Sequence, residues 1–202
     1  MKVVSLLSSA GILSIALAAV FTVGCASKNN PTVHFQPAVS QALVGTPKAS
    51  VRVATIQDWR PLHNKSTVGQ QRNGHGHRTS DFVLAQKPLG DIFREGLVHA
   101  MEENQYQVAP GSGRYELRGG IKEFNCTQVH GFWDATGKSE LEVQFELINK
   151  VTGNSVWKKS YIGRGTVSTP WSAKGTMGSM FTQSASDVVD QLLADASFRQ
   201  YF

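Results

Sequence analysis

Two histidines are the residues of this chain whose spacing could support metal chemistry. His75 and His77 flank Gly76, and two histidines one residue apart on an extended chain can bind the same ion. A protein metal site needs three or four ligands, and no further cluster of ligating residues stands near this pair in the sequence. The pattern therefore favours a solvated turn, and we expect neither a metal nor another cofactor.

Cys126 is the second candidate for chemistry, as a thiol nucleophile. No signature of a catalytic cysteine accompanies it, and its surroundings indicate a small, half-buried strand residue. The chain also lacks a Gly-x-Ser-x-Gly elbow, a Walker loop and a His-Glu-x-x-His motif. We predict that the protein is not an enzyme. The alternative is a metal-dependent or thiol enzyme that uses His75 and His77 or Cys126.

Side chains that binding surfaces favour gather in three stretches predicted as loops. Stretch 62–80 is long and polar with a turn signal at Asn73-Gly74, and stretches 128–137 and 168–176 carry large aromatics. Arg and Trp are enriched among residues that dominate binding, and loops on a rigid scaffold commonly carry function. An alternative is that the aromatics cap the core. The candidate contact residues are Arg72, Asn73, His75, His77, Arg78, Phe132, Trp133 and Trp171.

Two amphipathic helices are expected to position these loops. The first begins at Pro88, and Asn104 can close it in the left-handed conformation. Its apolar stripe places Leu97 at the centre, so Leu97 should be fully buried. The second begins near Met177 and is expected to run to about Phe198. The stripe of the first helix consists of Leu89, Ile92, Phe93, Gly96, Leu97, Ala100 and Met101.

The remaining elements are expected to be strands. Residues 140–148 alternate most clearly between apolar and charged side chains, which is typical of a half-buried strand. Gly119-Gly120 suggests a bulge or a close backbone approach, and Asp58 and Arg60 could pair at the end of the first strand. The predicted strands cover 51–56, 106–108, 114–126, 140–148 and 156–167. The sequence thus predicts an α+β two-layer sandwich, a mostly antiparallel sheet covered on one face by two helices.

Residues 1–25 have the layout of an export signal: a basic start at Lys2, an apolar run and small residues at the end. Because it ends in Val23-Gly24-Cys25, the segment resembles a bacterial lipoprotein signal, which implies cleavage before Cys25 and lipid on that residue. An uncleaved membrane helix is the alternative, although the serines in the run argue against it. Residues 25–48 then form a lipidated, flexible linker that spans about 25 Å, and 49–202 form one domain.

Composition limits the classes of partner and of fold. The chain has 202 residues, of which 41% are hydrophobic and 17% charged, as in a globular protein. The net charge of +5 is scattered, without the basic stripe and interleaved aromatics that nucleic-acid binding uses, so no nucleic-acid partner is expected. With lipid on Cys25, Cys126 has no cysteine partner, and no disulfide is expected.

Several short motifs together resemble the YajG-like lipoproteins of Gram-negative bacteria, over roughly residues 49–197. The resemblance implies an outer-membrane lipoprotein that faces the periplasm and has no assigned catalysis. Ala26 after the lipidated cysteine is similar to the outer-membrane sorting pattern. The expected partners are the membrane, through the lipid, and an envelope protein, glycan or lipid in cell-wall or lipid transport. The matching motifs are Gly24-Cys25, Asp58-x-Arg60, Arg72-Asn73-Gly74, Arg78-Thr79-Ser80-Asp81, Tyr106-x-Val108, Tyr115-x-Leu117-x-Gly119 to Phe124, and Leu141 to Leu147.

Overall fold

The computed structural model describes residues 48–72, 78–130, 134–170 and 176–202, which form seven strands and three helices. The strands are β1 (Ser50–Asp58), β2 (Thr67–Arg72), β3 (Arg78–Leu84), β4 (Gln107–Val108), β5 (Tyr115–His130), β6 (Asp134–Asn149) and β7 (Ser155–Pro170). The helices are α1 (Leu89–Glu103), α2 (Thr176–Ala194) and α3 (Ala196–Arg199). None of these helices is long and apolar enough to cross a membrane.

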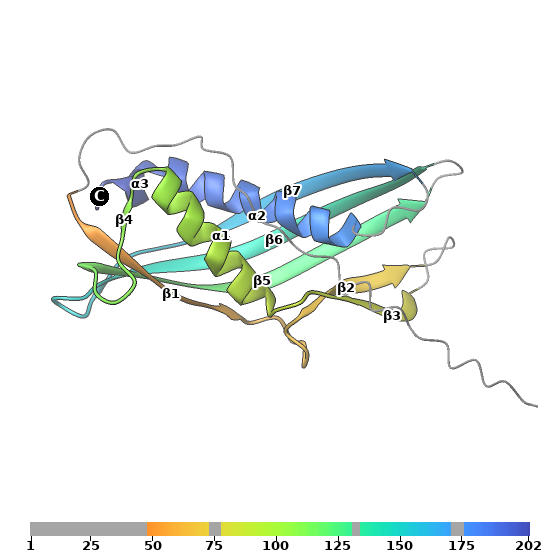
Figure 1. Cartoon of the computed structure of the whole chain (residues 1–202), viewed down its shortest axis with the longest axis horizontal. Coiled ribbons are helices and arrows are strands. Elements are labelled where there is room, and N and C mark those ends of the chain that lie inside the picture. The colour runs from red at the N-terminus through yellow and green to blue at the C-terminus, as the bar shows by residue number, and fades with distance from the viewer. Residues whose placement is uncertain (1–47, 73–77, 131–133, 171–175) are drawn as a thin grey trace, which may run out of the picture.

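Five strands form one curled sheet in the order β4-β1-β5-β6-β7. β1 runs parallel to β4 and β5, whereas β6 is antiparallel to both β5 and β7. Helices α1 and α2 lie on the same face of this sheet and leave the other face open (Figure 1). The predicted α+β class, with a mostly antiparallel sheet and two covering helices, is therefore confirmed.

The core lies between the helices and the sheet, where the predicted periodicities place it. On β6, Leu141, Val143, Phe145 and Leu147 are all fully buried, as the alternation of this strand requires. Leu97 in the middle of α1 is also fully buried, as predicted, and Phe181 on α2 is buried with it. The apolar stripes of the helices thus pack against the inward-facing side chains of the strands and form one hydrophobic core.

Helix α2 also covers the outer edge of β7, the last strand of the sheet. The N–H groups of Arg164 and Thr166 donate to side-chain oxygens of Asp187 (2.8 Å) and Gln183 (2.9 Å). Gln191 donates to the carbonyl of Ile162 at 2.9 Å. Because Gln183, Asp187 and Gln191 stand four residues apart, they form one stripe on the helix. This edge is therefore less available for pairing with another strand.

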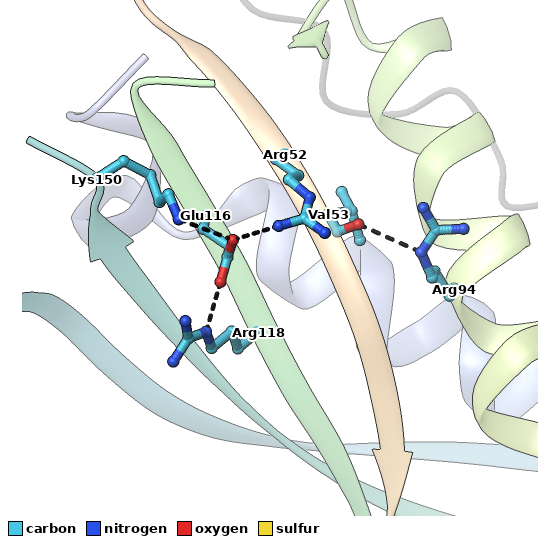
Figure 2. A network of polar contacts seen from close by, with 6 residues as sticks. All are labelled: Arg52, Val53, Arg94, Glu116, Arg118 and Lys150. Carbon is cyan, nitrogen blue, oxygen red and sulfur yellow. Dashed lines mark hydrogen bonds and ion pairs between the residues drawn. The ribbon is translucent and has the colours of Figure 1, made fainter. Parts of the chain in front are cut away.

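At the opposite edge of the sheet, α1 covers the part of β1 that extends beyond the short β4. Arg94 Nε donates to the carbonyl oxygen of Val53 at 3.2 Å (Figure 2). Gly90 lies so close to β1 that a Cβ at this position would stand 2.2 Å from the carbonyl oxygen of Ile56. A glycine is therefore required where the first turn of α1 contacts this strand.

The predicted polar loop over residues 62–80 is wrong at Thr67–Arg72 and from Arg78 on. There, β2 and β3 pair as an antiparallel two-stranded ribbon, in which Thr67 lies opposite Leu84 and Arg72 opposite Arg78. A Cβ at Gly69 would stand 2.7 Å from Cys126 Sγ and 3.1 Å from Met177 Sδ. The small residue therefore lets β2 pass closely over β5 and beside α2.

Two helix ends differ from the prediction. Gln105, not Asn104, takes the left-handed conformation after α1, with φ of 67°. Asn104 is buried instead, and its side-chain amide donates to the carbonyl of Ala100. Helix α2 ends at Ala194 rather than near Phe198, because Asp195 takes an extended backbone and accepts the N–H of Ser197. That hydrogen bond starts the separate short helix α3.

The two ends of the described domain meet, because the Lys48 N–H donates to the Phe202 carbonyl at 2.7 Å. Beside this contact lies an aromatic cluster in which Tyr106 packs against Phe198 and Phe202. The Tyr106 hydroxyl is buried and has no hydrogen-bond partner in the described part of the chain. Burial raises the pKa of Tyr106 to about 12.

Replacing Tyr106 with phenylalanine is expected to raise the free energy of unfolding by about 1 kcal/mol, because it removes a buried, unsatisfied hydroxyl. In the unfolded chain Tyr106 ionises near pH 10, whereas in the folded protein it ionises near pH 12. The free energy of unfolding of the wild type is therefore unaffected by this ionisation below pH 10 and falls as the pH rises from 10 to about 12. The variant should lose less over that window. Urea unfolding across the alkaline range measures both effects.

Tyr201→Phe is the matched control for this change. The Tyr201 hydroxyl donates to the Val156 carbonyl at 2.7 Å, so its removal should destabilise by about 1 kcal/mol. Equal destabilisation by the two substitutions would show that the Tyr106 hydroxyl has a partner in solution.

Candidate functional site

Most of the contact residues predicted from the sequence lie outside the described residues. These are Asn73, His75, His77, Phe132, Trp133 and Trp171, and the predicted lipidation site Cys25 also lies outside the described residues. Arg72 and Arg78 are described as the paired last residue of β2 and first residue of β3. The predicted contact surface on loops, and its alternative as a cap on the core, therefore both remain predictions.

The strand ends that border these segments nevertheless gather at one end of the molecule. His130 lies opposite Ala135, and Asp134 lies opposite Pro170, so the ends of β5 and β7 and the start of β6 are adjacent. The β2–β3 ribbon lies toward the same end, while the C-terminus lies at the opposite end (Figure 1). The described residues that border the three undescribed segments therefore lie toward one end of the sheet.

A buried ion pair fixes the segment that leads into the ribbon. Arg60 donates to both carboxylate oxygens of Asp58, from Nε at 2.9 Å and from Nη2 at 2.6 Å, and both side chains are only 4% exposed. Nη1 of Arg60 donates to the Thr67 carbonyl at 2.9 Å, at the start of β2. This confirms the pair predicted at the end of the first strand and shows that it connects β1 to β2.

The open face of the sheet contains a hollow of about 360 Å³ that the sequence did not reveal. Its lining comes from β1, β5, β6 and β7 and from Trp59, directly after β1. We call it the open-face hollow. Its charged side chains and its exposed indole belong to Arg52, Trp59, Glu116, Arg118, Glu146 and Lys158.

Glu116 is the centre of the charges in this hollow. It accepts hydrogen bonds from Arg118 Nε at 2.6 Å, from Arg52 Nη1 at 2.7 Å and from Lys150 Nζ at 3.4 Å (Figure 2). The hydrogen bond from Arg118 is the main cause that lowers the pKa of the Glu116 carboxyl. Its side chain is 4% exposed, whereas those of Arg52 and Arg118 are 42% and 55% exposed. The carboxylate therefore holds the cations in place while their outer atoms face solvent.

The surface charge of the hollow is positive as a result. Arg52, Arg118 and Lys158 line the hollow together with Glu116 and Glu146, which leaves one positive charge in excess. Lys150, which contacts Glu116 from outside the lining, adds a second. Glu146 lies between Arg118 and Lys158 in the strand register. In the described part of the chain, neither guanidinium has a hydrogen-bonded acceptor other than Glu116. The remaining guanidinium N–H groups can bind an anion.

Trp59 provides an aromatic surface beside these cations. Its backbone N–H donates to the Ile121 carbonyl, and its indole Nε1 donates to Gln57 Oε1, both of which hold it in place. A Cβ on Gly120 would lie 2.4 to 2.6 Å from three atoms of the indole, so the ring lies flat on the backbone of that glycine. Trp59 is 47% exposed. One face of the indole therefore rests on β5, and the other is available to a ligand.

The Gly119-Gly120 pair is the sequence signal that could have indicated this hollow. It predicted either a bulge or a close approach, and the structure shows close approaches at both glycines. Gly119 faces the core side, where a Cβ would stand 2.9 Å from the ring of Phe145. The bulge itself occurs between Ile121 and Glu123. The sequence could not show that Trp59 is the group that covers Gly120.

Cys126 lies on the other side of the sheet. It is half-buried and packs against the core under Gly69, which confirms the predicted half-buried strand residue. Among the residues that the structure describes, no group of three or more His, Cys, Asp or Glu side chains is placed to hold a metal ion. His99 on α1 is exposed and contacts Glu103.

No family model and no curated protein matches the chain. Among solved structures it is similar to protein XCC0632 of family DUF330 from Xanthomonas campestris, with a TM-score of 0.53 and 16% identity over 84% of this chain and 94% of that chain. A PelC dodecamer from Paraburkholderia phytofirmans (TM-score 0.36, 17% identity, 74% and 92% covered) and lipoprotein GNA1162 from Neisseria meningitidis (0.34, 13%, 64% and 90%) are less similar. The similarity to XCC0632 shows a shared fold.

Proposed function

We propose that this protein is a non-catalytic binding protein, held by lipid on Cys25 at the periplasmic face of the outer membrane. Its single domain, over residues 49–202, would serve cell-wall or lipid transport by binding an envelope partner. The export signal that ends in Val23-Gly24-Cys25 and the resemblance to YajG-like lipoproteins support the location. The loop residues proposed from the sequence remain candidates for a second contact surface.

The observation that carries the binding role is the open-face hollow. Binding sites are concave and combine apolar surface with a few well-placed polar groups. The hollow has both, because the indole of Trp59 lies beside guanidinium groups that Glu116 holds in position. These groups are fixed before a ligand arrives, which reduces the entropy that binding costs.

The alternative, a thiol enzyme that uses Cys126, receives less support. The Cys126 side chain packs on the helix-covered face of β5 under Gly69, whereas the hollow lies on the open face. The thiol therefore does not line the concave site that a substrate would enter. The metal-dependent form of this alternative depends on His75 and His77, which lie outside the described residues.

Replacing Cys25 with serine tests the anchor. In a Gram-negative host, the variant should remain an unprocessed precursor and should not incorporate labelled palmitate, because the acceptor sulfur is missing. Cys126→Ser is the matched control and should be labelled and processed as the wild type is. Normal labelling of Cys25→Ser would contradict the proposed anchor, and recovery of the labelled wild type in the inner membrane would contradict the proposed location.

A further inference from the structure

We propose that the open-face hollow binds an acidic saccharide, with a sugar ring stacked on Trp59 and its carboxylate held by Arg52 and Arg118. This proposal rests on the proposed function, because it names the ligand class of the same binding site. Three features of the hollow carry it: the exposed aromatic surface, the excess of exposed positive charge and the polar groups between them.

The aromatic surface fits a flat, partly apolar ring. Trp59 is 47% exposed and is the most exposed aromatic side chain of the described residues. Its ring is held on one side by Gly120 and at Nε1 by Gln57. Because the indole is already ordered, a ligand that stacks on its free face does not lose affinity by ordering it.

Arg118 is close along β5 to the residue that the indole covers. Arg118 and Gly120 are alternate residues of β5 on the same face, so their Cα atoms lie about 6.6 Å apart. Trp59 covers Gly120, and Arg118 lines the same hollow. A sugar over the indole can therefore direct a ring carboxylate toward Arg118. Arginine binds carboxylates through two parallel hydrogen bonds, which favours this group over a neutral one.

The remaining lining favours a saccharide over a lipid chain. Gln57 and Gln144 line the hollow and offer amide groups, and Glu146 offers a carboxylate that can accept hydrogen bonds from hydroxyls. The Glu116 carboxylate is buried and contacts three cations. Because these cations neutralise its charge, Glu116 repels an anionic ligand less than an exposed carboxylate would. A ligand with hydroxyls, an apolar ring face and a negative charge satisfies all of these groups together.

Calorimetry with the full-length lipidated protein, in micelles of a detergent without a sugar head group, tests this proposal. Trigalacturonic acid is the probe, and its methyl ester is the matched neutral ligand. We expect the acid to bind at least about tenfold more tightly than the ester, since the carboxylate–guanidinium bonds are lost in the ester. Added salt should weaken binding of the acid more than binding of the ester.

Four variants locate the site. Trp59→Ala should weaken binding of the acid about tenfold, and Gly120→Ala should do the same because its methyl group displaces the indole. Arg118→Gln should weaken the acid about tenfold and leave the ester nearly unchanged. Lys122→Gln is the matched control, because Lys122 pairs with Glu142 on the same face outside the hollow. This control should bind as the wild type does.

The proposal is overturned if the acid does not bind, if the ester binds equally well, or if the Trp59 and Arg118 variants keep wild-type affinity while folded. Equal binding of inorganic phosphate would show a simple anion site and would also overturn it. These failures are distinct from failure of the proposed function. If the protein is labelled through Cys25 and crosslinks to a partner through residues outside the hollow, the proposed function would stand and only the saccharide proposal would fail.

Discussion

Asp58→Ala is expected to lower the free energy of unfolding by about 3–5 kcal/mol, because it leaves the Arg60 guanidinium buried without its carboxylate. Arg60 makes three of its described hydrogen bonds with Asp58 and one from Nη1 to the Thr67 carbonyl. The unpaired guanidinium should turn toward water and release the start of β2. Urea unfolding measures the stability, and hydrogen exchange of the β2 amides measures the release.

The control for this prediction is a solvent-exposed ion pair between a basic side chain and a carboxylate. Lys87 and Glu95 pair at 2.8 Å, with both side chains more than half exposed. Lys87→Ala should therefore change the stability by less than about 1 kcal/mol. A similar small change in Asp58→Ala would show that water reaches Arg60 and that the pair does not hold β2.

Leu97→Ala is expected to destabilise the protein by about 2–5 kcal/mol, the cost of removing a buried leucine and leaving a cavity. Leu97 is fully buried in the middle of the apolar stripe of α1. The loss should appear as a lower midpoint of urea unfolding with little change in its slope, since the surface exposed on unfolding hardly changes.

Val151→Ala provides the comparison, because Val151 is strongly exposed in the turn between β6 and β7. Its stability should stay within about 0.5 kcal/mol of the wild type. If Leu97→Ala behaved in the same way, the face of α1 that packs on the sheet would have been assigned incorrectly.

Periodicity is the reason that the sheet and both long helices could be predicted. A strand such as 140–148 alternates because one face is buried, and the α1 stripe repeats because one side of the helix is buried. These patterns are local, so the sequence alone reveals them. The buried pair of Asp58 and Arg60 was also local, since only one residue separates its partners at the end of the strand.

The β2–β3 ribbon could not be predicted, because its signal is not local. Residues Thr67–Arg72 are mostly polar and include Gly69, which is unfavourable in an ordinary strand. The ribbon is favoured by Cys126 and Met177, which are far away in the sequence and leave room only for a glycine. The local sequence of Thr67–Arg72 contains no sign of this contact.

The open-face hollow was missed for the same reason. Arg52 and Glu116 are 64 residues apart in the chain, and the parallel register of β1 and β5 places them opposite each other. The sequence pattern placed the candidate contact residues in the predicted loops and none on the sheet. Only the register shows that three cations converge on one carboxylate.

If Cys25 carries lipid as proposed, the contact between Lys48 and Phe202 sets which end of the domain lies nearer the membrane. With lipid on Cys25, the linker ends at Lys48, beside the start of β5, and β5 then extends about 50 Å away from that point. The hollow around Glu116 lies near the beginning of this strand, whereas His130 lies at its far end. With the linker length of about 25 Å that the sequence predicts, the far end of the sheet would stand about 75 Å from such an anchor. The two candidate surfaces would therefore meet different layers of the envelope, the hollow close to the outer membrane and the strand ends nearer the cell wall.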